Sequence, residues 1–570
     1  MLKQFSFFLA LTFLIPVSLF ASGDTVHVWM TLSNDSSITA GLAPQLDAVF
    51  RPDSPAASPS SAIRVDADTQ YQEWEGAGAS FTDAAAWCVN RELLAGLRDS
   101  VMRALFDPAK GIGMSFLRNP MGSSDLTVER YTYDSDSTDI NDTTLPHFSI
   151  SHDTLDVLPL TKWARALNPE LTLMMNAWSP PAWMKTNNSV MVGGVRPECY
   201  PHLARYYVRT IQAYESLGVH INYVSLNNEP TCCPGLDYPS VVDITAADMQ
   251  AMLRYHWFPQ FAEHKLSTKI LLHDFNWYDI ITTEPMLSDT LITRSPYVGG
   301  VAFHGYFGDP ATQTRIHNQY GLDIFQTERS SHAGTPVRVQ QRQNFQDMAV
   351  MLRNWSRSYV KWPVATNENW GPHLGGCSAC LGMITVYTGG ARAGQFDYTI
   401  DYYTIGHLTK FVRNKARRIF STNDSTVLNV AFINPDKSIA VVAYNNDSLA
   451  SRKFKVLWGP KSFTYTIPAA ASMTFVWDGS TLAARNPGIR AIAQEMPDVK
   501  LAGNVLVVTP KMRGKLSAEV FTTSGRRVRY DGKDGGALRI RLDGLSAGIY
   551  HLRIKDEFGH YWKKVYVRGE

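Results

Sequence analysis

Three successive segments have a strand–helix–strand pattern: Leu171-Thr-Leu-Met-Met-Asn-Ala-Trp178, residues 201–217, and Ile221-Asn-Tyr-Val-Ser-Leu-Asn227. The first and last segments are short apolar runs, which are typical of parallel strands buried on both faces. The middle segment has apolar residues three and four positions apart, as in a helix that covers such a sheet. Together they predict a βαβ crossover.

The same alternation of apolar runs and helical patterns extends over residues 75–412. Plausible further helices occupy residues 84–106, 246–262 and 343–358. Eight parallel strands are the number that closes a barrel, so the sequence predicts an α/β fold, a (β/α)8 TIM barrel. The eight apolar runs are residues 76–80, 114–119, 171–178, 221–227, 269–274, 299–306, 322–327 and 360–366.

Alternating strand patterns lie on both sides of the barrel. Those in residues 24–74 are too few to form a domain, so we expect them to join residues 413–478 in one attached β-sandwich. Residues 479–499 contain Gly, Arg and Pro and are predicted to be a linker. Residues 500–570 again alternate between turns, which predicts a small, separate all-β module.

The composition is that of a folded protein and argues against several classes. The 570 residues are 45% hydrophobic, enough for large cores, and the formal net charge is only +2. No run of Lys or Arg is long enough to bind nucleic acid through its phosphates. Residues 1–23 have Lys3, an apolar run and then small residues, which predicts a signal peptide, with an N-terminal membrane anchor as the alternative. The signal peptide predicts that the protein is secreted or lies on the outer cell surface. No other segment is predicted to span a membrane.

Six cysteines follow the predicted signal peptide, an even number in a compartment that permits disulfides. Cys377 and Cys380 lack the second pair of ligands that a structural zinc site needs, which favours a disulfide in a short loop. The neighbours Cys232 and Cys233 cannot easily bond each other, so different partners or free thiols are expected.

Two glutamates follow the fourth and seventh predicted strands, in Asn227-Asn228-Glu229-Pro230 and Gln326-Thr327-Glu328-Arg329. Reactive residues of such barrels lie at the C-terminal ends of the strands. Cleavage of a glycosidic bond needs one protonated and one ionised carboxyl, about 5–5.5 Å apart in a retaining enzyme. The pattern predicts a retaining glycosidase that works by double displacement, and Glu368 is the alternative nucleophile.

Aromatic side chains at the same strand ends suggest a sugar-binding floor. Trp178, Trp183, Tyr306 and Trp362 fall there, although each alone is better explained by packing. Asn228 can donate to a sugar 2-hydroxyl. His304 can donate to a hydroxyl or to Glu328, and a structural histidine of the core explains it equally well. Since no His and carboxylate residues cluster at metal-ligand spacing, neither a metal nor a cofactor is expected.

Five motifs together resemble glycoside hydrolase family 30, which includes the lysosomal glucosylceramidase, and the resemblance covers residues 26–477. It implies that Glu229 is the acid/base and Glu328 the nucleophile. It also implies that Asp125, Trp178, Asn228 and Trp362 lie in the glycone site, and that the β-sandwich draws on both sides of the barrel. The motifs are Gly76-Ala-Gly-Ala-Ser-Phe-Thr-Asp83, Ser115-Phe-Leu-Arg-Asn-Pro-Met-Gly-Ser-Ser-Asp125, Trp178-Ser-Pro-Pro-Ala-Trp-Met-Lys-Thr-Asn187, Asn227-Asn-Glu-Pro230 and Thr327-Glu328.

The sequence departs from the family pattern after the seventh strand. Arg329 follows the predicted nucleophile, where a small residue or cysteine is commoner. A cation beside a carboxylate favours its charged form, so we expect Arg329 to lower the pKa of Glu328.

The C-terminal segment resembles the sorting domain of type IX secretion cargo. The resemblance lies in Phe521-Thr-Thr-Ser-Gly-Arg-Arg-Val528, Leu545-Ser-Ala-Gly-Ile-Tyr-His-Leu552 and Lys563-Lys-Val-Tyr-Val567. It implies contact with a secretion machinery, export across an outer membrane and retention at the cell surface.

The expected substrate is a carbohydrate or glycoconjugate. The resemblance implies a β-glucoside, either glucosylceramide-like or a β-glucan. A β-1,6-glucanase, a xylan-active enzyme and a carbohydrate-binding surface protein without catalysis remain as alternatives. Linkage and exo or endo action stay open.

Overall fold

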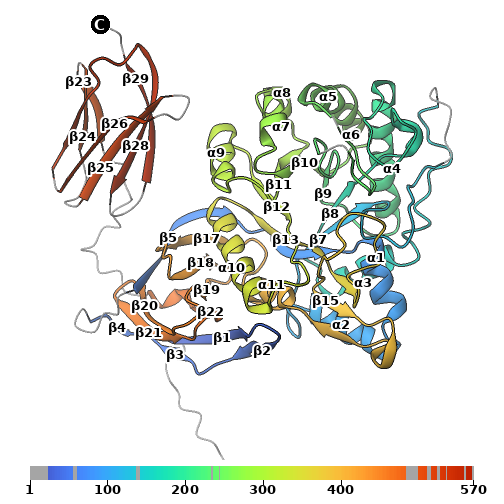
Figure 1. The fold of residues 1–570 in the computed structure, drawn as a ribbon, viewed down its shortest axis with the longest axis horizontal. Coiled ribbons are helices and arrows are strands. Elements are labelled where there is room, and N and C mark those ends of the chain that lie inside the picture. Colours follow the sequence, from blue (N-terminus) through green and yellow to red (C-terminus); the bar gives the residue numbers. More distant parts are fainter. Residues whose placement is uncertain are drawn as a thin grey trace, which may run out of the picture. The chain divides into compact units, whose positions relative to one another are not determined.

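A computed structural model describes residues 24–54, 61–135, 142–232, 235–242, 244–482, 498–502, 504–509, 515–522, 527–534, 536–556 and 560–567 (Figure 1). The chain forms two compact units, Met1–Ala483 and Ala484–Glu570. The predicted signal peptide, most of the predicted linker, and Cys233 lie outside the described residues. No helix within the described residues is long and apolar enough to cross a membrane.

The first unit contains an eight-stranded parallel sheet whose strands follow one another in chain order. The last strand returns to the first and also meets the seventh: Arg357 N–H donates to the Ile324 carbonyl at 2.8 Å, and Trp362 N–H donates to the Arg329 carbonyl at 3.0 Å. These bonds bring the sheet round to a closed barrel, as predicted. The strands are β6 (Gly76–Ser80), β7 (Phe116–Met121), β8 (Thr172–Ala177), β9 (Tyr223–Ser225), β10 (Lys269–Asn276), β11 (Val298–His304), β12 (Ile324–Glu328) and β13 (Ser358–Pro363).

Helices surround the barrel strands (Figure 1). The α-helices are α1 (Asp83–Trp87), α2 (Ala95–Phe106), α3 (Val157–Leu167), α4 (Tyr200–Ser216), α5 (Ala246–Met252), α6 (Phe258–Glu263), α7 (Ile280–Leu287), α8 (Thr290–Thr293), α9 (Ala311–Tyr320), α10 (Val337–Arg353) and α11 (Ile400–Thr409). Helices of the 3-10 or π type are η2 (Cys88–Glu92), η3 (Ala182–Met184), η4 (Pro197–Cys199), η5 (Leu253–Trp257), η6 (Gly390–Arg392) and η7 (Gly479–Leu482).

Two predicted helices differ from the structure. The helix expected over residues 84–106 is interrupted, because the backbone at Leu93 and Leu94 is extended and Leu94 N–H donates to the Gly394 carbonyl at 3.0 Å. The helix expected over residues 343–358 instead spans Val337–Arg353. It ends there because Trp355 adopts a φ of 72°, a left-handed conformation that a helix cannot continue through.

The side chains inside the barrel form two layers. The lower layer is mostly apolar, and the upper layer, nearer the C-terminal ends of the strands, is mostly polar. Side chains two positions apart on a strand point to the same side. Six strands therefore place an interior polar or aromatic residue directly above an interior packing residue. The lower layer is Phe116, Met174, Tyr223, Leu271, Ala302, Phe325 and Val360. The residues two positions after all of these except Leu271 are Arg118, Asn176, Ser225, His304, Thr327 and Trp362.

Strand β10 breaks this alternation. His273 and Asp274 have φ of 74° and 59°, and the register with β11 shifts between His273 and Phe275. This bulge turns Asp274, rather than His273, toward the residues of the upper layer. The bulge therefore adds one carboxylate to the polar layer.

A second sheet of eleven strands wraps around its own core beside the barrel. The N-terminal strands join it: β1 pairs with β22 and β5 lies between β17 and β20 (Figure 1). Arg353 of α10 donates to Ser421 and Asn429, which ties the barrel to this sandwich. Its strands are β1 (Thr25–Ser33), β2 (Ile38–Pro44), β3 (Ala48–Val49), β4 (Arg51–Pro52), β5 (Ser61–Glu73), β17 (Arg417–Ser421), β18 (Val427–Ile433), β19 (Ser438–Asn445), β20 (Arg452–Trp458), β21 (Lys461–Ile467) and β22 (Ser472–Asp478).

Two smaller structures complete the chain. A three-stranded sheet of β14 (Ala365–Asn367), β15 (Ile384–Val386) and β16 (Phe396–Tyr398) carries the loop that follows β13. The second unit consists of two antiparallel sheets around their own apolar core. The predicted fold class is confirmed. The strands of the second unit are β23 (Asp498–Ala502), β24 (Val505–Thr509), β25 (Lys515–Thr522), β26 (Arg527–Asp534), β27 (Leu538–Arg541), β28 (Gly548–Asp556) and β29 (His560–Val567).

Candidate active site

The two glutamates meet at the C-terminal end of the barrel. Glu328 is the last residue of β12, and Glu229 lies in the loop after β9, where its N–H donates to the Asp274 carbonyl at 3.1 Å. Glu229 has a φ of 47°, which an L-residue adopts only when its surroundings enforce it. A carboxylate oxygen of each lies within 4.8 Å of one from the other, a separation near the roughly 5 Å of retaining glycosidases.

Arg118 is the fully buried cation between these groups. Its Nη1 donates to Glu328 Oε2 at 2.7 Å, and its Nη2 donates to Asn228 Oδ1 at 2.7 Å and to Asp274 Oδ2 at 3.1 Å. Burial alone would lower the pKa of Arg118, but the charges of Asp274 and Glu328 outweigh it and keep the guanidinium ionised. Sequence reasoning assigned this residue no role, although an arginine within an otherwise buried strand needs such partners.

Asp274 is a second residue that sequence reasoning missed. Its side chain has no exposed surface, and it accepts hydrogen bonds from Arg118, His304, Ser225, Asn176 and Thr327. Burial opposes its ionisation, but Arg118 and His304 outweigh burial and hold the pKa of Asp274 well below its usual value. Asp274 is therefore a permanent anion beneath the two glutamates.

His304 bridges Asp274 and Glu229. Its Nδ1 lies 3.0 Å from Glu229 Oε1, and its Nε2 lies 3.3 Å from Asp274 Oδ1. Burial lowers the pKa of His304, but Glu328, Asp274 and Glu229 together raise it to about 9. As an imidazolium it donates from both nitrogens. Of the two glutamates, His304 hydrogen-bonds Glu229 and not Glu328, because its Nδ1 lies 3.8 Å from Glu328 Oε1.

Glu328 has donors on both oxygens. Arg118 binds Oε2, and the Tyr306 hydroxyl donates to Oε1 at 3.0 Å. Burial raises the pKa of Glu328 above its ordinary value, while His304 and Arg118 favour the carboxylate. The expectation that Arg329 lowers this pKa is wrong: Arg329 pairs with Asp347 of α10 at 2.7 Å, and the net shift is upward.

Trp178 and Trp362 form a buried aromatic pair beside Asp125. Their rings stack with centroids 4.9 Å apart, and they are 4% and 2% exposed. Trp362 Nε1 donates to Asp125 Oδ1 at 3.3 Å, and the backbone of Cys377 donates to Asp125 Oδ2 at 3.1 Å. Burial raises the pKa of Asp125 to about 7. The structure thus brings all the glycone residues expected from the sequence into one neighbourhood.

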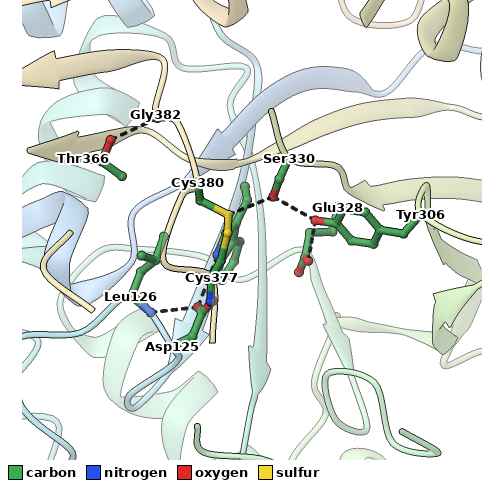
Figure 2. The surroundings of a disulfide bond; sticks show 10 residues. Asp125, Leu126, Tyr306, Glu328, Ser330, Thr366, Cys377, Cys380 and Gly382 are labelled. Carbon is green, nitrogen blue, oxygen red and sulfur yellow. Dashed lines mark hydrogen bonds between the residues drawn. A yellow bond between two sulfur atoms is a disulfide. The ribbon is translucent and has the colours of Figure 1, made fainter. Parts of the chain in front are cut away.

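A disulfide joins Cys377 and Cys380, as favoured from the sequence, and belongs to the same apolar cluster as the two tryptophans. Figure 2 shows that it connects two parts of the site. Cys377 N–H binds Asp125, whereas Cys380 Sγ lies 3.4 Å from Ser330 Oγ. Ser330 Oγ is 2.9 Å from the Tyr306 hydroxyl, so contacts run without a break from the disulfide to Glu328.

Two expected residues lie apart from this cluster, and one unforeseen residue joins it. Glu368 accepts hydrogen bonds from the backbone of Thr388 and Gly389, which explains it as a loop-holding residue rather than a nucleophile. Trp183 donates from Nε1 to the Asp134 carbonyl at 3.0 Å. Tyr238, in an irregular loop without a sequence pattern, places its hydroxyl 3.5 Å from Glu229 Oε2.

Within the part of the chain that the structure describes, two groups of side chains have the composition of a metal site. Glu229, His304 and Glu328 form one, and His332, Cys377 and Cys380 form the other. In the first, His304 is held as a donor between Glu229 and Asp274. In the second, the two sulfurs are bonded to each other. Neither donor set fits a metal ion, because ligands must present free lone pairs.

Comparison with known proteins gives one family for most of the chain. Residues 74–412 match the glycosyl hydrolase family 30 TIM-barrel domain, and residues 415–475 match its beta sandwich domain. An endo-1,6-beta-D-glucanase of Neurospora crassa is 30% identical over 66% of this chain and 79% of its own length. The lysosomal acid glucosylceramidase of Mus musculus is 24% identical over 68% of this chain and 77% of its own length.

Among solved structures, the endo-beta1,6-glucanase BT3312 is 26% identical, with a TM-score of 0.70. That alignment covers 80% of this chain and 99% of the other. The barrel match alone spans more than half of the sequence. The chain therefore belongs to glycosyl hydrolase family 30 and is a glycoside hydrolase.

Proposed function

We propose that the protein hydrolyses β-1,6-linked glucan with retention of configuration, with Glu328 as nucleophile and Glu229 as acid/base. The observation that carries the assignment is the pair of carboxylate oxygens within 4.8 Å, each glutamate held by a different set of donors. Identity to the matched β-1,6-glucanases is 26–30%, against 23–26% for the matched glucosylceramidases. This difference supports glucan as the first candidate substrate.

In the first step, a Glu328 oxygen bonds to the anomeric carbon as the bond to the leaving oxygen breaks. Arg118 and Tyr306 hold Glu328 as a carboxylate and fix its direction. Glu229 gives its proton to the leaving oxygen. Because His304 donates to Oε1 of Glu229, Oε2, on the side of Tyr238, is the oxygen that carries this proton.

In the second step, Glu229 takes a proton from water, and the water oxygen bonds to the anomeric carbon as its bond to Glu328 breaks. Asn228 accepts from Arg118 through Oδ1, which leaves its amide N–H groups for the sugar 2-hydroxyl. Asp125 and the tryptophan pair hold the ring through both steps.

Trapping the covalent intermediate tests the roles. A 2-deoxy-2-fluoro-β-glucosyl fluoride should add one fluoroglucosyl group to the Glu328 peptide, as read by mass spectrometry. Glu229→Gln should regain turnover of an activated aryl glucoside with azide and release β-glucosyl azide. A label on any other residue would refute the nucleophile, and failure of azide rescue would refute the acid/base.

Glucosylceramide is the second candidate, because the matched relatives include glucosylceramidases. Rates on β-1,6-gluco-oligosaccharides, glucosylceramide and xylan, compared at equal enzyme concentration, decide between the candidates. Faster turnover of glucosylceramide than of the oligosaccharides would make glucosylceramide the first candidate instead of glucan.

We further propose that residues 1–23 direct export and that the C-terminal unit serves type IX sorting and retention at the outer cell surface. The support is the sequence resemblance together with a C-terminal unit that has its own two sheets and core. Cell fractionation and N-terminal sequencing of the native protein test this. A cytoplasmic protein that retains Met1 would contradict it.

A further inference from the structure

Two exposed aromatic side chains stand at the mouth of the barrel. Tyr278 is 71% and Phe307 is 70% exposed, although large aromatics are usually buried. Tyr278 follows β10 and Phe307 follows β11, which are neighbouring strands. Tyr278 N–H donates to the Phe307 carbonyl at 3.2 Å, so the two side chains leave adjacent backbone positions.

The backbone around this pair is specifically built. Gly308 follows Phe307 with a φ of 105°, and a Cβ there would lie 2.5 Å from the Tyr278 nitrogen. Only glycine permits both this conformation and this approach. The two loops are therefore held together in a way that keeps both rings at the rim.

The pair is linked to the acid/base through residues of the two strands that precede it. The strands that precede the two aromatics also supply Asp274 and His304, whose carbonyl and imidazole bind Glu229. Asp279, next to Tyr278, has its pKa raised by burial and also by the charge of Glu229. Because the acid/base protonates the leaving oxygen, the space beside it receives the leaving group.

We infer that Tyr278 and Phe307 form a leaving-group subsite that takes the glucose rings of an oligosaccharide, an inference that rests on the proposed function. The apolar face of a pyranose stacks on an exposed aromatic ring, and its hydroxyls need polar partners at the edge. The Asp279 carboxylate, half-buried beside Tyr278, supplies an acceptor. A lipid chain in the same place would desolvate that carboxylate without compensation. The subsite thus makes the enzyme act on a bond with sugar on both sides.

Two substrates separate the subsite from the chemistry. The leaving group of β-glucosyl fluoride is a fluoride ion, whereas the leaving group of a β-1,6-linked glucotetraose is a sugar. In Tyr278→Ala and Phe307→Ala the ratio of kcat/KM for glucotetraose to that for the fluoride should fall about fivefold to tenfold each, and further in the double variant. Tyr255→Ala, at a 64% exposed tyrosine in η5, is the matched control and should keep the wild-type ratio.

Three other results would contradict either the subsite or the proposed substrate. An unchanged ratio in the double variant overturns the subsite. A fall in glucosylceramide hydrolysis with an unchanged glucotetraose ratio also overturns it, in favour of a lipid platform. Wild-type enzyme that cleaves the fluoride but not glucotetraose overturns the proposed glucan substrate, a failure visible without any variant.

Discussion

The two halves of the catalytic pocket are built by opposite means. The half proposed to hold the sugar ring is buried and covalently braced, with Trp178 and Trp362 stacked and a disulfide loop beside Asp125. The half beside Glu229 has two mostly exposed aromatic residues at its rim, Tyr278 and Phe307. A ring that must be distorted at its anomeric carbon needs rigid walls, whereas a departing chain needs only a platform.

If the proposed roles hold, this difference assigns bond cleavage and the choice of leaving group to separate elements. Asp125, Trp178 and Trp362 come from β7, β8 and β13 or the segments directly after them, whereas the rim pair comes from the loops after β10 and β11. The loops that carry the rim pair can therefore change without disturbing the buried charges. Variants on each side should show where the boundary between the halves lies.

The largest effect is expected at the nucleophile that both halves share. Glu328→Gln should lower kcat by about 10⁴-fold or more on β-glucosyl fluoride, because no other carboxylate can form the intermediate. Glu368→Gln is the matched control, since its carboxylate binds the loop at Thr388 and Gly389. Steady-state kinetics would count against this assignment if Glu368→Gln lost activity as severely as Glu328→Gln.

Arg118→Lys should have the next largest effect, because it keeps the charge but loses the fork that reaches Glu328, Asn228 and Asp274 at once. We expect kcat to fall about 10²-fold on both substrates of the subsite test. Arg329→Lys, whose partner is Asp347, should remain near wild type. If Arg329→Lys lost more activity than Arg118→Lys, the essential cation would be Arg329 and not Arg118.

The disulfide belongs to the sugar-binding half, so its loss should weaken sugar binding more than bond cleavage. Reduction with dithiothreitol, verified by thiol counting, should raise KM for β-glucosyl fluoride about tenfold with a smaller change in kcat. The Cys377→Ser/Cys380→Ser variant should show the raised KM and no response to the reductant. Cys199→Ser, at a buried thiol outside the pocket, should respond as wild type does. Full activity after complete reduction would show that the loop needs no covalent brace.

Much of the barrel, and the meeting of Glu229 and Glu328 at one rim, could be predicted from the sequence, because parallel strands give clear apolar runs and their C-terminal ends share one rim. Glu229 and Glu328 follow directly from that rule. Arg329 shows its limit, because neighbouring residues in a strand point to opposite sides. Arg329 is adjacent to Glu328 in the chain, but its side chain points the other way and pairs with Asp347 of α10.

The buried charges could not be assigned from the pattern for a different reason. Asp274 faces the pocket only because positive φ angles at His273 and Asp274 shift the alternation of β10. Nothing in an apolar periodicity marks such a bulge. Tyr238 reaches Glu229 from a loop without regular structure, and its approach depends on tertiary packing. Residues of this kind are found only when the fold is known.

The smallest expected effect concerns how the free energy of unfolding depends on pH. We expect one titrating residue from each half, His304 and Asp125, to control a different pH range. His304 has its pKa raised from 6.5 to about 9, so its contribution to the free energy of unfolding is complete below about 6.5 and is lost as the pH rises through about 9. Asp125 has its pKa raised from 3.8 to about 7, so it stays protonated in the folded protein and its contribution declines as the pH rises toward about 7. Urea denaturation between about pH 4 and 10 should show that His304→Gln removes the decline above pH 7 and Asp125→Asn the decline below it. Each variant is the control for the other, and a variant that changed both limbs would mean that the two halves titrate as one network.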